Sequence, residues 1–209
     1  TKSEDYPANK RFKLQIVSNI LNIVKREIDI LPGVVTDFML DAAECQYVQS
    51  LSYSSTEMHL GGGKLAVASE SDGVTLFNTQ SNGDLDSLFS YNLSGGQAQS
   101  VYAFENAVIG GFSNDKGCYM ALLESDGNSV ANYTAFANGY SINGIDFSDN
   151  IIALATGNDG VQLYEWSGSS NVSPYASIST NEYAYDLKIK GDLIFVATRS
   201  GLEIYKIGI

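Results

Sequence analysis

The sequence predicts an all-β fold, a small β-propeller built from four-stranded antiparallel blades. One motif, a glycine followed by a short apolar strand, starts at Gly73, Gly117, Gly160 and Gly201, with spacings of 44, 43 and 41 residues. A period of this length is typical of propeller repeats. Two further observations support the same fold: each motif completes a hairpin, and additional strands flank each hairpin.

Each motif is the second arm of a predicted β-hairpin. The first arm is a nearly continuous apolar run, as expected for a strand that is covered on both faces. The connecting turns are rich in Asn, Asp, Ser and Gly, which tolerate the positive φ of a tight turn. The first arms are residues 64–69, 107–112, 151–156 and 193–198.

A strand precedes each of the last three hairpins, and another strand follows each of the first three. The preceding strands are predicted at residues 100–104, 143–147 and 185–189, and the following strands at residues 87–93, 130–136 and 175–179. Four strands in each unit match a propeller blade. The repeats are clear over residues 58–209.

The N-terminal quarter leaves two alternatives open. Residues 1–11 are polar and are expected to form a flexible tether. From Phe12 to Ile28 the apolar residues follow the helical period, but residues 25–30 fit an alternating edge strand equally well. Over residues 34–56, a helix that begins near Thr36 and a degenerate copy of the downstream strands are equally supported.

The last repeat has no fourth strand after residues 201–205. An open strand edge invites pairing with another strand, and in propellers the other terminus commonly supplies it. Residues 23–30 are the expected donor, which favours a strand over a short N-terminal helix there. The prediction is then about five blades, one of them a degenerate unit at residues 23–57, in a single domain of residues 12–209.

The composition narrows the range of partners. The chain has 12 Lys and Arg against 24 Asp and Glu, a net charge of −12. Nucleic-acid binding requires cationic neutralisation of phosphates, so no nucleic-acid partner is expected. Anionic membrane surfaces are disfavoured for the same reason. No run of about 18 apolar residues is present, so no transmembrane segment is expected.

Only 17% of the residues are charged, while Gly, Tyr, Ser and Asn are abundant. A surface of neutral polar groups is more usual outside the cytoplasm, which favours the periplasm or cell surface. The polar, proline-containing start at Thr1 looks like the tether that follows the lipidated cysteine of secreted bacterial lipoproteins. We therefore expect an extracytoplasmic protein, and for its start a lipid anchor upstream of Thr1 and an ordinary flexible terminus are equally supported.

Two cysteines, Cys45 and Cys118, lie in dissimilar contexts without CxxC spacing. This pattern gives no support to a zinc site or a thioredoxin-type centre. A single disulfide and two buried free thiols both remain open.

The hairpins at residues 151–164 and 193–205 resemble the LVIVD-type repeat of bacterial secreted propellers. In both, a hydrophobic strand, a glycine turn and a second strand follow one another. The resemblance covers about residues 58–209, although the usual Asp-x-Ser-Asn-Pro continuation is absent. It implies interaction with a protein or a surface, and it brings no catalytic motif. The Gly-His and Trp-Asp marks of WD40 blades are missing, since the lone Trp166 has no Asp after it.

Few residues suggest chemistry. His59 is the only histidine and aligns with first-strand positions, so a structural role is expected. Asp146 and Asp186 lie in axial strands, where paired carboxylates would suit glycoside hydrolysis, but a surface or turn role is favoured. The acidic turns at residues 82–86 and 124–128 lack the spacing of known calcium loops. No cofactor, metal or catalytic residue is expected.

Tyr140, Tyr183 and Tyr185 lie at the beginnings of successive first strands, on the side of the Asp-Gly hairpin turns. Tyrosines clustered on one propeller rim would suit glycan stacking or protein contact, while filling of the gaps between blades is the competing interpretation. The leading hypothesis is a non-enzymatic propeller that binds a protein or polysaccharide partner through one face. The alternative is a propeller-type hydrolase, a glycosidase or metal-dependent lactonase, with acidic residues in the central tunnel.

Overall fold

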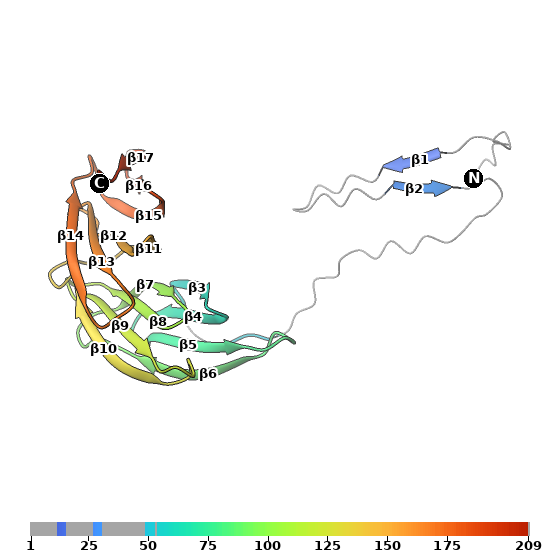
Figure 1. The fold of residues 1–209 in the computed structure, drawn as a ribbon, viewed down its shortest axis with the longest axis horizontal. Coiled ribbons are helices and arrows are strands. Elements are labelled where there is room, and N and C mark those ends of the chain that lie inside the picture. The colour runs from blue at the N-terminus through green and yellow to red at the C-terminus, as the bar shows by residue number, and fades with distance from the viewer. Residues whose placement is uncertain (1–11, 16–26, 31–48, 53, 209) are drawn as a thin grey trace. The chain divides into compact units, whose positions relative to one another are not determined.

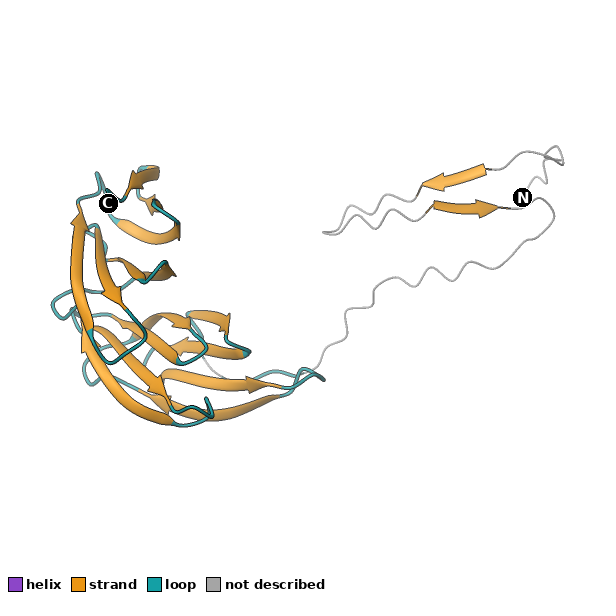
Figure 2. Ribbon diagram, in the orientation of Figure 1, coloured by secondary structure: helices purple, strands orange, loops and turns teal. Residues whose placement is uncertain are grey.

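The computed structural model describes residues 12–15, 27–30, 49–52 and 54–208. The chain divides into two units, residues 1–47 and residues 48–209. The described part consists of strands, turns and loops, with no helix in it, as Figure 2 shows. It therefore contains no helix that could span a membrane.

In the first unit, β1 (Phe12–Gln15) and β2 (Glu27–Ile30) form a two-stranded antiparallel sheet in which Phe12 lies opposite Ile30. A helix was one expectation for residues 12–28, and it is wrong at residues 12–15 and 27–28, which form strands. Residues 16–26 lie outside the described residues. Ile28 and Ile30 alternate with charged residues, and β-branched side chains favour a strand. β2 pairs with β1 in this sheet, and the expected role of residues 23–30 in closing the last blade stays a prediction.

The second unit contains four antiparallel sheets, each a propeller blade (Figure 1). Their strands pair in sequence order. Blade 1 consists of β3 (Glu57–Gly61), β4 (Lys64–Ser69), β5 (Gly73–Thr79) and β6 (Leu85–Tyr91). Blade 2 consists of β7 (Ala98–Ala103), β8 (Ala107–Phe112), β9 (Gly117–Leu123) and β10 (Val130–Phe136). Blade 3 consists of β11 (Gly144–Ser148), β12 (Ile151–Ala155), β13 (Val161–Trp166) and β14 (Val172–Ile178). Blade 4 consists of β15 (Ala184–Lys190), β16 (Leu193–Thr198) and β17 (Gly201–Lys206).

The predicted four-stranded blades are thus confirmed in blades 1 to 3, while blade 4 has three strands, as the sequence predicts. The described residues form four blades and not about five. The expected fifth unit, residues 23–57, supplies only β2 and the first residue of β3 among its described residues. The sequence of this unit lacks the repeated pattern of the other units, in which a glycine-containing turn joins two apolar strands. The helix or degenerate strands considered for residues 34–56 fall mainly outside the described residues, and the described residues 49–52 and 54–56 are neither helix nor strand.

Hydrophobic cores lie between consecutive blades. Val74 and Leu76 of β5 pack against Val101 of β7 at the junction of blades 1 and 2. Cys118 and Met120 lie in the core between blades 2 and 3, and the third core is built by blades 3 and 4. Each fully buried aliphatic side chain contributes roughly 1.5–3 kcal/mol relative to exposure. The junctions between blades therefore hold the arc together.

The first strands β3, β7, β11 and β15 pack against one another in succession. Within this unit the blades follow an arc from β3–β6 to β15–β17 (Figure 1). Because the side chains of a strand alternate between its two faces, each first strand presents one set of residues to the preceding blade and the other to the following blade.

Candidate functional site

The loops that join the blades and the hairpin turns meet on one rim of the arc. The Gly117 amide donates to the Tyr140 carbonyl at 2.9 Å, and the Arg199 amide donates to the Tyr183 carbonyl at 3.0 Å. Tyr140 and Tyr183 therefore lie beside hairpin turns, where the repeat pattern places them. These bonds use backbone groups, so the tyrosine rings are free to face other groups.

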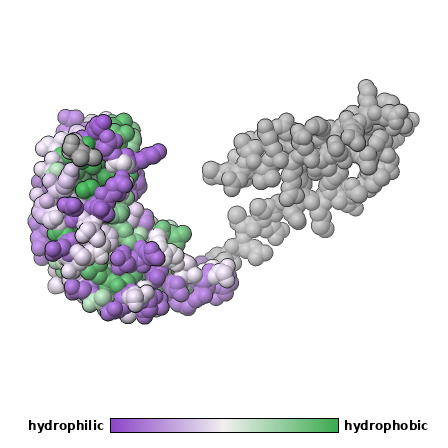
Figure 3. Space-filling model, in the orientation of Figure 1, coloured by the Kyte–Doolittle hydropathy of each residue, from purple (hydrophilic) through white to green (hydrophobic). Residues whose placement is uncertain are grey.

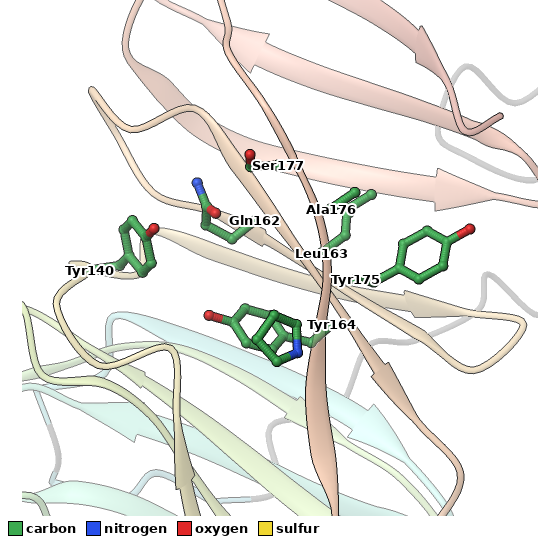
Figure 4. A pocket seen from close by; sticks show the side chains of 8 residues that line it. Tyr140, Gln162, Leu163, Tyr164, Tyr175, Ala176 and Ser177 are labelled. Carbon is green, nitrogen blue, oxygen red and sulfur yellow. The ribbon is translucent and has the colours of Figure 1, made fainter.

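Tyr140 lines a pocket of about 330 Å³ on blade 3. Gln162 and Tyr164 lie two residues apart on β13, so both face the same side of the sheet. Figure 4 shows Tyr140, Gln162 and Tyr164 on one side of β14, while the Tyr175 ring extends away from them. The other lining residues are Leu163, Pro174, Tyr175, Ala176 and Ser177.

The pocket has no charged side chain among its lining residues. One amide hydrogen of Gln162 is used by the Asp159 carbonyl at 2.9 Å, which fixes the side chain against the β12–β13 turn. Burial, with smaller contributions from Tyr140 and Cys118, raises the pKa of Tyr164. The Tyr164 hydroxyl is therefore neutral at physiological pH. The Tyr164 ring is only 8% exposed and packs against Phe136, with centroids 5.3 Å apart. The lining therefore offers the Tyr140 ring, hydroxyls and an amide, which suits a neutral polar ligand.

Tyr183 and Tyr185 form a second cluster, at the junction of blades 3 and 4. Their ring centroids are 4.9 Å apart, and the Arg199 guanidinium lies 5.6 Å from the centroid of Tyr183. The Arg199 Nε donates to the Tyr185 hydroxyl at 3.5 Å, and Asn143 Nδ2 donates to the Tyr183 hydroxyl at 3.0 Å. Tyr185 remains 48% exposed.

Of the three predicted rim tyrosines, the structure brings together Tyr183 and Tyr185 and leaves Tyr140 apart. Tyr140 packs against the core between blades 2 and 3. Sequence reasoning missed Gln162, Tyr164 and Arg199. Gln162 and Arg199 lie in or next to the hairpin turns, so the glycine pattern marked their place, but nothing in the sequence indicated which side chains would face Tyr140 or Tyr183.

The axial strands hold polar residues that bridge neighbouring blades. The Val101 amide donates to Glu57 Oε2 at 2.9 Å, and the Ile189 amide donates to Asp146 Oδ2 at 2.8 Å. Burial raises the pKa of Glu57 most strongly, and the nearby Asp186 adds to this shift. The Asp186 carboxylate accepts from its neighbouring Leu187 amide at 2.8 Å. Each of these carboxylates is thus engaged by a backbone amide.

His59 has a similar bridging position. Its Nδ1 accepts from the Ala103 amide at 3.0 Å, which assigns the proton of the neutral ring to Nε2. The ring stacks on Tyr102 with centroids 3.9 Å apart. Burial lowers the pKa of His59, and the positive charge of Lys188 adds to this effect.

Protonation of His59 is expected to weaken the junction of blades 1 and 2. Because the pKa of His59 is lower in the folded protein than the ordinary histidine pKa of about 6.5, the unfolded chain binds more protons near that pH. The stabilisation from this group is therefore complete above pH 6.5 and is lost as the pH falls through the folded pKa. Urea unfolding of the wild type and of His59→Gln between pH 8 and pH 5 checks this, and equal slopes of stability against pH in the two proteins would contradict it.

The remaining candidates have local roles where they are described. The acidic turns contain ordinary Asx hydrogen bonds, such as Asp84 N to Asn82 Oδ1 at 3.0 Å and Asn128 N to Asp126 Oδ1 at 2.9 Å. The described residues contain no group of three or more His, Cys, Asp or Glu that could hold a metal. Cys118 is a buried free thiol, and burial raises its pKa. The pairing considered with Cys45 lies outside the described residues.

Comparison with known proteins supports the propeller fold. No protein-family model matches the sequence, and no curated protein matches it. The fold is similar to the computationally designed Ika4 protein, with a TM-score of 0.60 and 10% identity over 78% of this chain and 96% of that one. It is also similar to a chain of the mitotic checkpoint complex, with a TM-score of 0.57 and 14% identity over 71% of this chain and 48% of that one.

A third similar structure is the β-propeller domain of Cps50 (Swd1) from Myceliophteria thermophila. The TM-score is 0.54 at 12% identity, over 74% of this chain and 54% of that one. The present chain therefore spans about half the length of the last two of these structures. At these identities the similarity establishes the fold alone, and the LVIVD repeat type is not confirmed.

Proposed function

We propose that this protein is a non-enzymatic, extracytoplasmic propeller that binds a neutral polysaccharide in the Tyr140 pocket. The observation that carries the proposal is a pocket lined by Tyr140, Tyr164 and Gln162 without a charged side chain. Aromatic rings supply flat apolar faces, and their hydroxyls supply polar contacts at the edge. A sugar ring has the matching surfaces, with apolar C–H faces and hydroxyls around its rim.

Charge and size support a neutral sugar over other ligands. The net charge of −12 disfavours anionic polysaccharides. A volume of about 330 Å³ lies at the lower end of the range for ligand pockets, which suits one residue of a longer glycan chain. The small share of charged residues, 17%, supports the extracytoplasmic location.

Replacing Tyr140 by alanine is expected to weaken glycan binding about tenfold, because loss of roughly 1.4 kcal/mol of contact changes affinity by that factor. Tyr140→Phe keeps the ring and should retain most of the affinity. A panel of neutral polysaccharides, measured by isothermal titration calorimetry, provides the test.

Tyr133→Ala is the matched control, since Tyr133 is another exposed tyrosine, at 39%, on the outer strand of blade 2. It should bind like the wild type. If Tyr140→Ala and Tyr133→Ala bind the glycan with equal affinity, the Tyr140 pocket is not the binding site. Failure of every glycan, with capture of a protein by the wild type but not by Tyr140→Ala, would favour a protein partner.

The alternative hydrolase function uses the axial carboxylates. The hydrogen bonds from the Val101 and Ile189 amides give Glu57 and Asp146 a structural role, and this observation favours binding over catalysis. Turnover of a glycoside or lactone substrate that is lost in Asp146→Asn and in Asp186→Asn would establish the hydrolase.

A further inference from the structure

The two ends of the arc expose hydrophobic side chains. On blade 1, Met58 and Leu60 are 68% and 67% exposed, and we call them the leading end face. On blade 4, Leu202 and Ile204 are 67% and 58% exposed, and we call them the trailing end face. Hydrophobic surface is in view at both ends of the arc in Figure 3. Exposed apolar patches of this kind mark interaction sites.

The repeat shows which surface the leading end face is built to contact. Met58 occupies the first-strand position that Val101, Ile145 and Leu187 occupy in the other blades. Those three side chains are at most 2% exposed, because each packs against the preceding blade. Met58 has the same strand position without a preceding blade among the described residues. The leading end face is therefore one half of a blade junction.

The trailing end face is the other half. Leu202 and Ile204 follow Gly201 as Val74 and Leu76 follow Gly73. Val74 and Leu76 are fully buried against blade 2. The corresponding pairs of blades 2 and 3 are buried in the same way: Cys118, Met120, Val161 and Leu163. One chain thus carries both complementary halves of an interface that it forms three times internally.

The junction of blades 1 and 2 also contains a polar contact, in which Glu57 accepts the Val101 amide of the next blade. Asp186 occupies the position of Glu57 in blade 4, where its Oδ1 accepts the Leu187 amide of its own strand. The match of the two end faces therefore rests on their apolar positions.

Self-complementarity and length identify a second copy of this chain as the occupant. The charges at the trailing end face are paired within the chain, with Lys188 Nζ 4.0 Å from Asp186 Oδ1 and Lys206 Nζ 3.1 Å from Asp192 Oδ2. The repeated apolar positions of the two end faces therefore select the partner. In addition, the chain covers only 54% of the similar β-propeller domain, so the arc of four blades corresponds to about half of such a ring.

We propose that two copies of this chain join head to tail and close a ring of eight blades, with the trailing end face of each copy on the leading end face of the other. Such contacts are heterologous, and two of them close because each copy supplies half of the ring. The proposal does not rest on glycan binding, since the Tyr140 pocket lies on blade 3 and away from both end faces.

The test measures the molar mass of the full chain by light scattering across a concentration series. The expected mass is twice the 22.5 kDa of one chain. Met58→Asp changes only the leading end face and Leu202→Asp only the trailing end face, and each variant alone should be monomeric. Ala131→Asp, on the exposed outer strand of blade 2, is the control and should remain dimeric. Far-ultraviolet circular dichroism confirms that each variant is folded.

Mixing the two variants gives the sharpest outcome. Met58→Asp retains an intact trailing end face, and Leu202→Asp retains an intact leading end face, so an equimolar mixture should form a heterodimer through one junction. A face-to-face dimer, in which each face contacts its own copy, cannot be restored in this way. Monomeric wild type at all concentrations, open filaments, or a mixture that stays monomeric while the wild type dimerises would each overturn the proposal.

Discussion

Replacing Gly160 by alanine is expected to lower the free energy of unfolding by about 3–5 kcal/mol, the sum of left-handed backbone strain and overpacking. Gly160 has a φ of +72°, and a Cβ atom there would lie 2.2 Å from the Ile178 carbonyl oxygen. That oxygen belongs to β14, which pairs with β13 and cannot move without breaking the sheet.

Gly63→Ala separates the two causes. Gly63 has nearly the same φ, +73°, but no atom within 4 Å of the added Cβ, so its replacement should cost only about 1–2 kcal/mol from the backbone. Urea unfolding at equilibrium measures both variants. If both variants lose the same free energy of unfolding, the contact of the added Cβ with the Ile178 carbonyl oxygen does not contribute to the destabilisation.

The repeated glycines also explain why the blades were predictable from sequence. Gly73, Gly117 and Gly160 have a positive φ, and at each of them a side chain would strike the backbone of the blade's fourth strand or the loop after it. Only glycine satisfies both conditions, so the pattern is forced by backbone geometry. The apolar runs before them are buried in the junctions, which removes the ambiguity between strand and helix.

The N-terminal segment could not be predicted in the same way. Its apolar residues fit a helical period and a strand alternation together, and the choice at β2 depends on pairing with β1, a contact of residues far apart in sequence. Local propensity is a weak prior where tertiary pairing decides. The open edge of β17 was visible in sequence, because no fourth strand follows the last hairpin.

The candidate site was only partly predictable. Regular spacing placed Tyr140 and Tyr183 beside the hairpin turns, because the loops between blades recur with the repeat. Their separation follows from side-chain direction: Tyr140 turns to the core of blades 2 and 3, while Tyr183 bonds Asn143. Gln162 and Tyr140 line the same pocket only because the folded chain brings β13 next to the loop that contains Tyr140. The sequence of one strand does not show this proximity.

A comparison of Leu76→Ala with Ile204→Ala tests the packing of the blades and the proposed ring together. The two residues occupy the same position of the repeat, but Leu76 is fully buried and Ile204 is 58% exposed within one chain. Leu76→Ala is expected to lower the free energy of unfolding by about 2–5 kcal/mol at any protein concentration, through lost contacts and the cavity left behind.

Ile204→Ala should depend on concentration. In the dilute single chain its cost is expected within about 0.5 kcal/mol, as for other surface positions. Where the second copy covers Ile204, the folded dimer is stabilised by mass action, so the cost should rise with protein concentration as the wild type gains stability and the variant does not. Urea unfolding at a low and a high concentration measures this difference. If Ile204→Ala remains harmless at both while Leu76→Ala is strongly destabilising, no junction forms at β17 in solution.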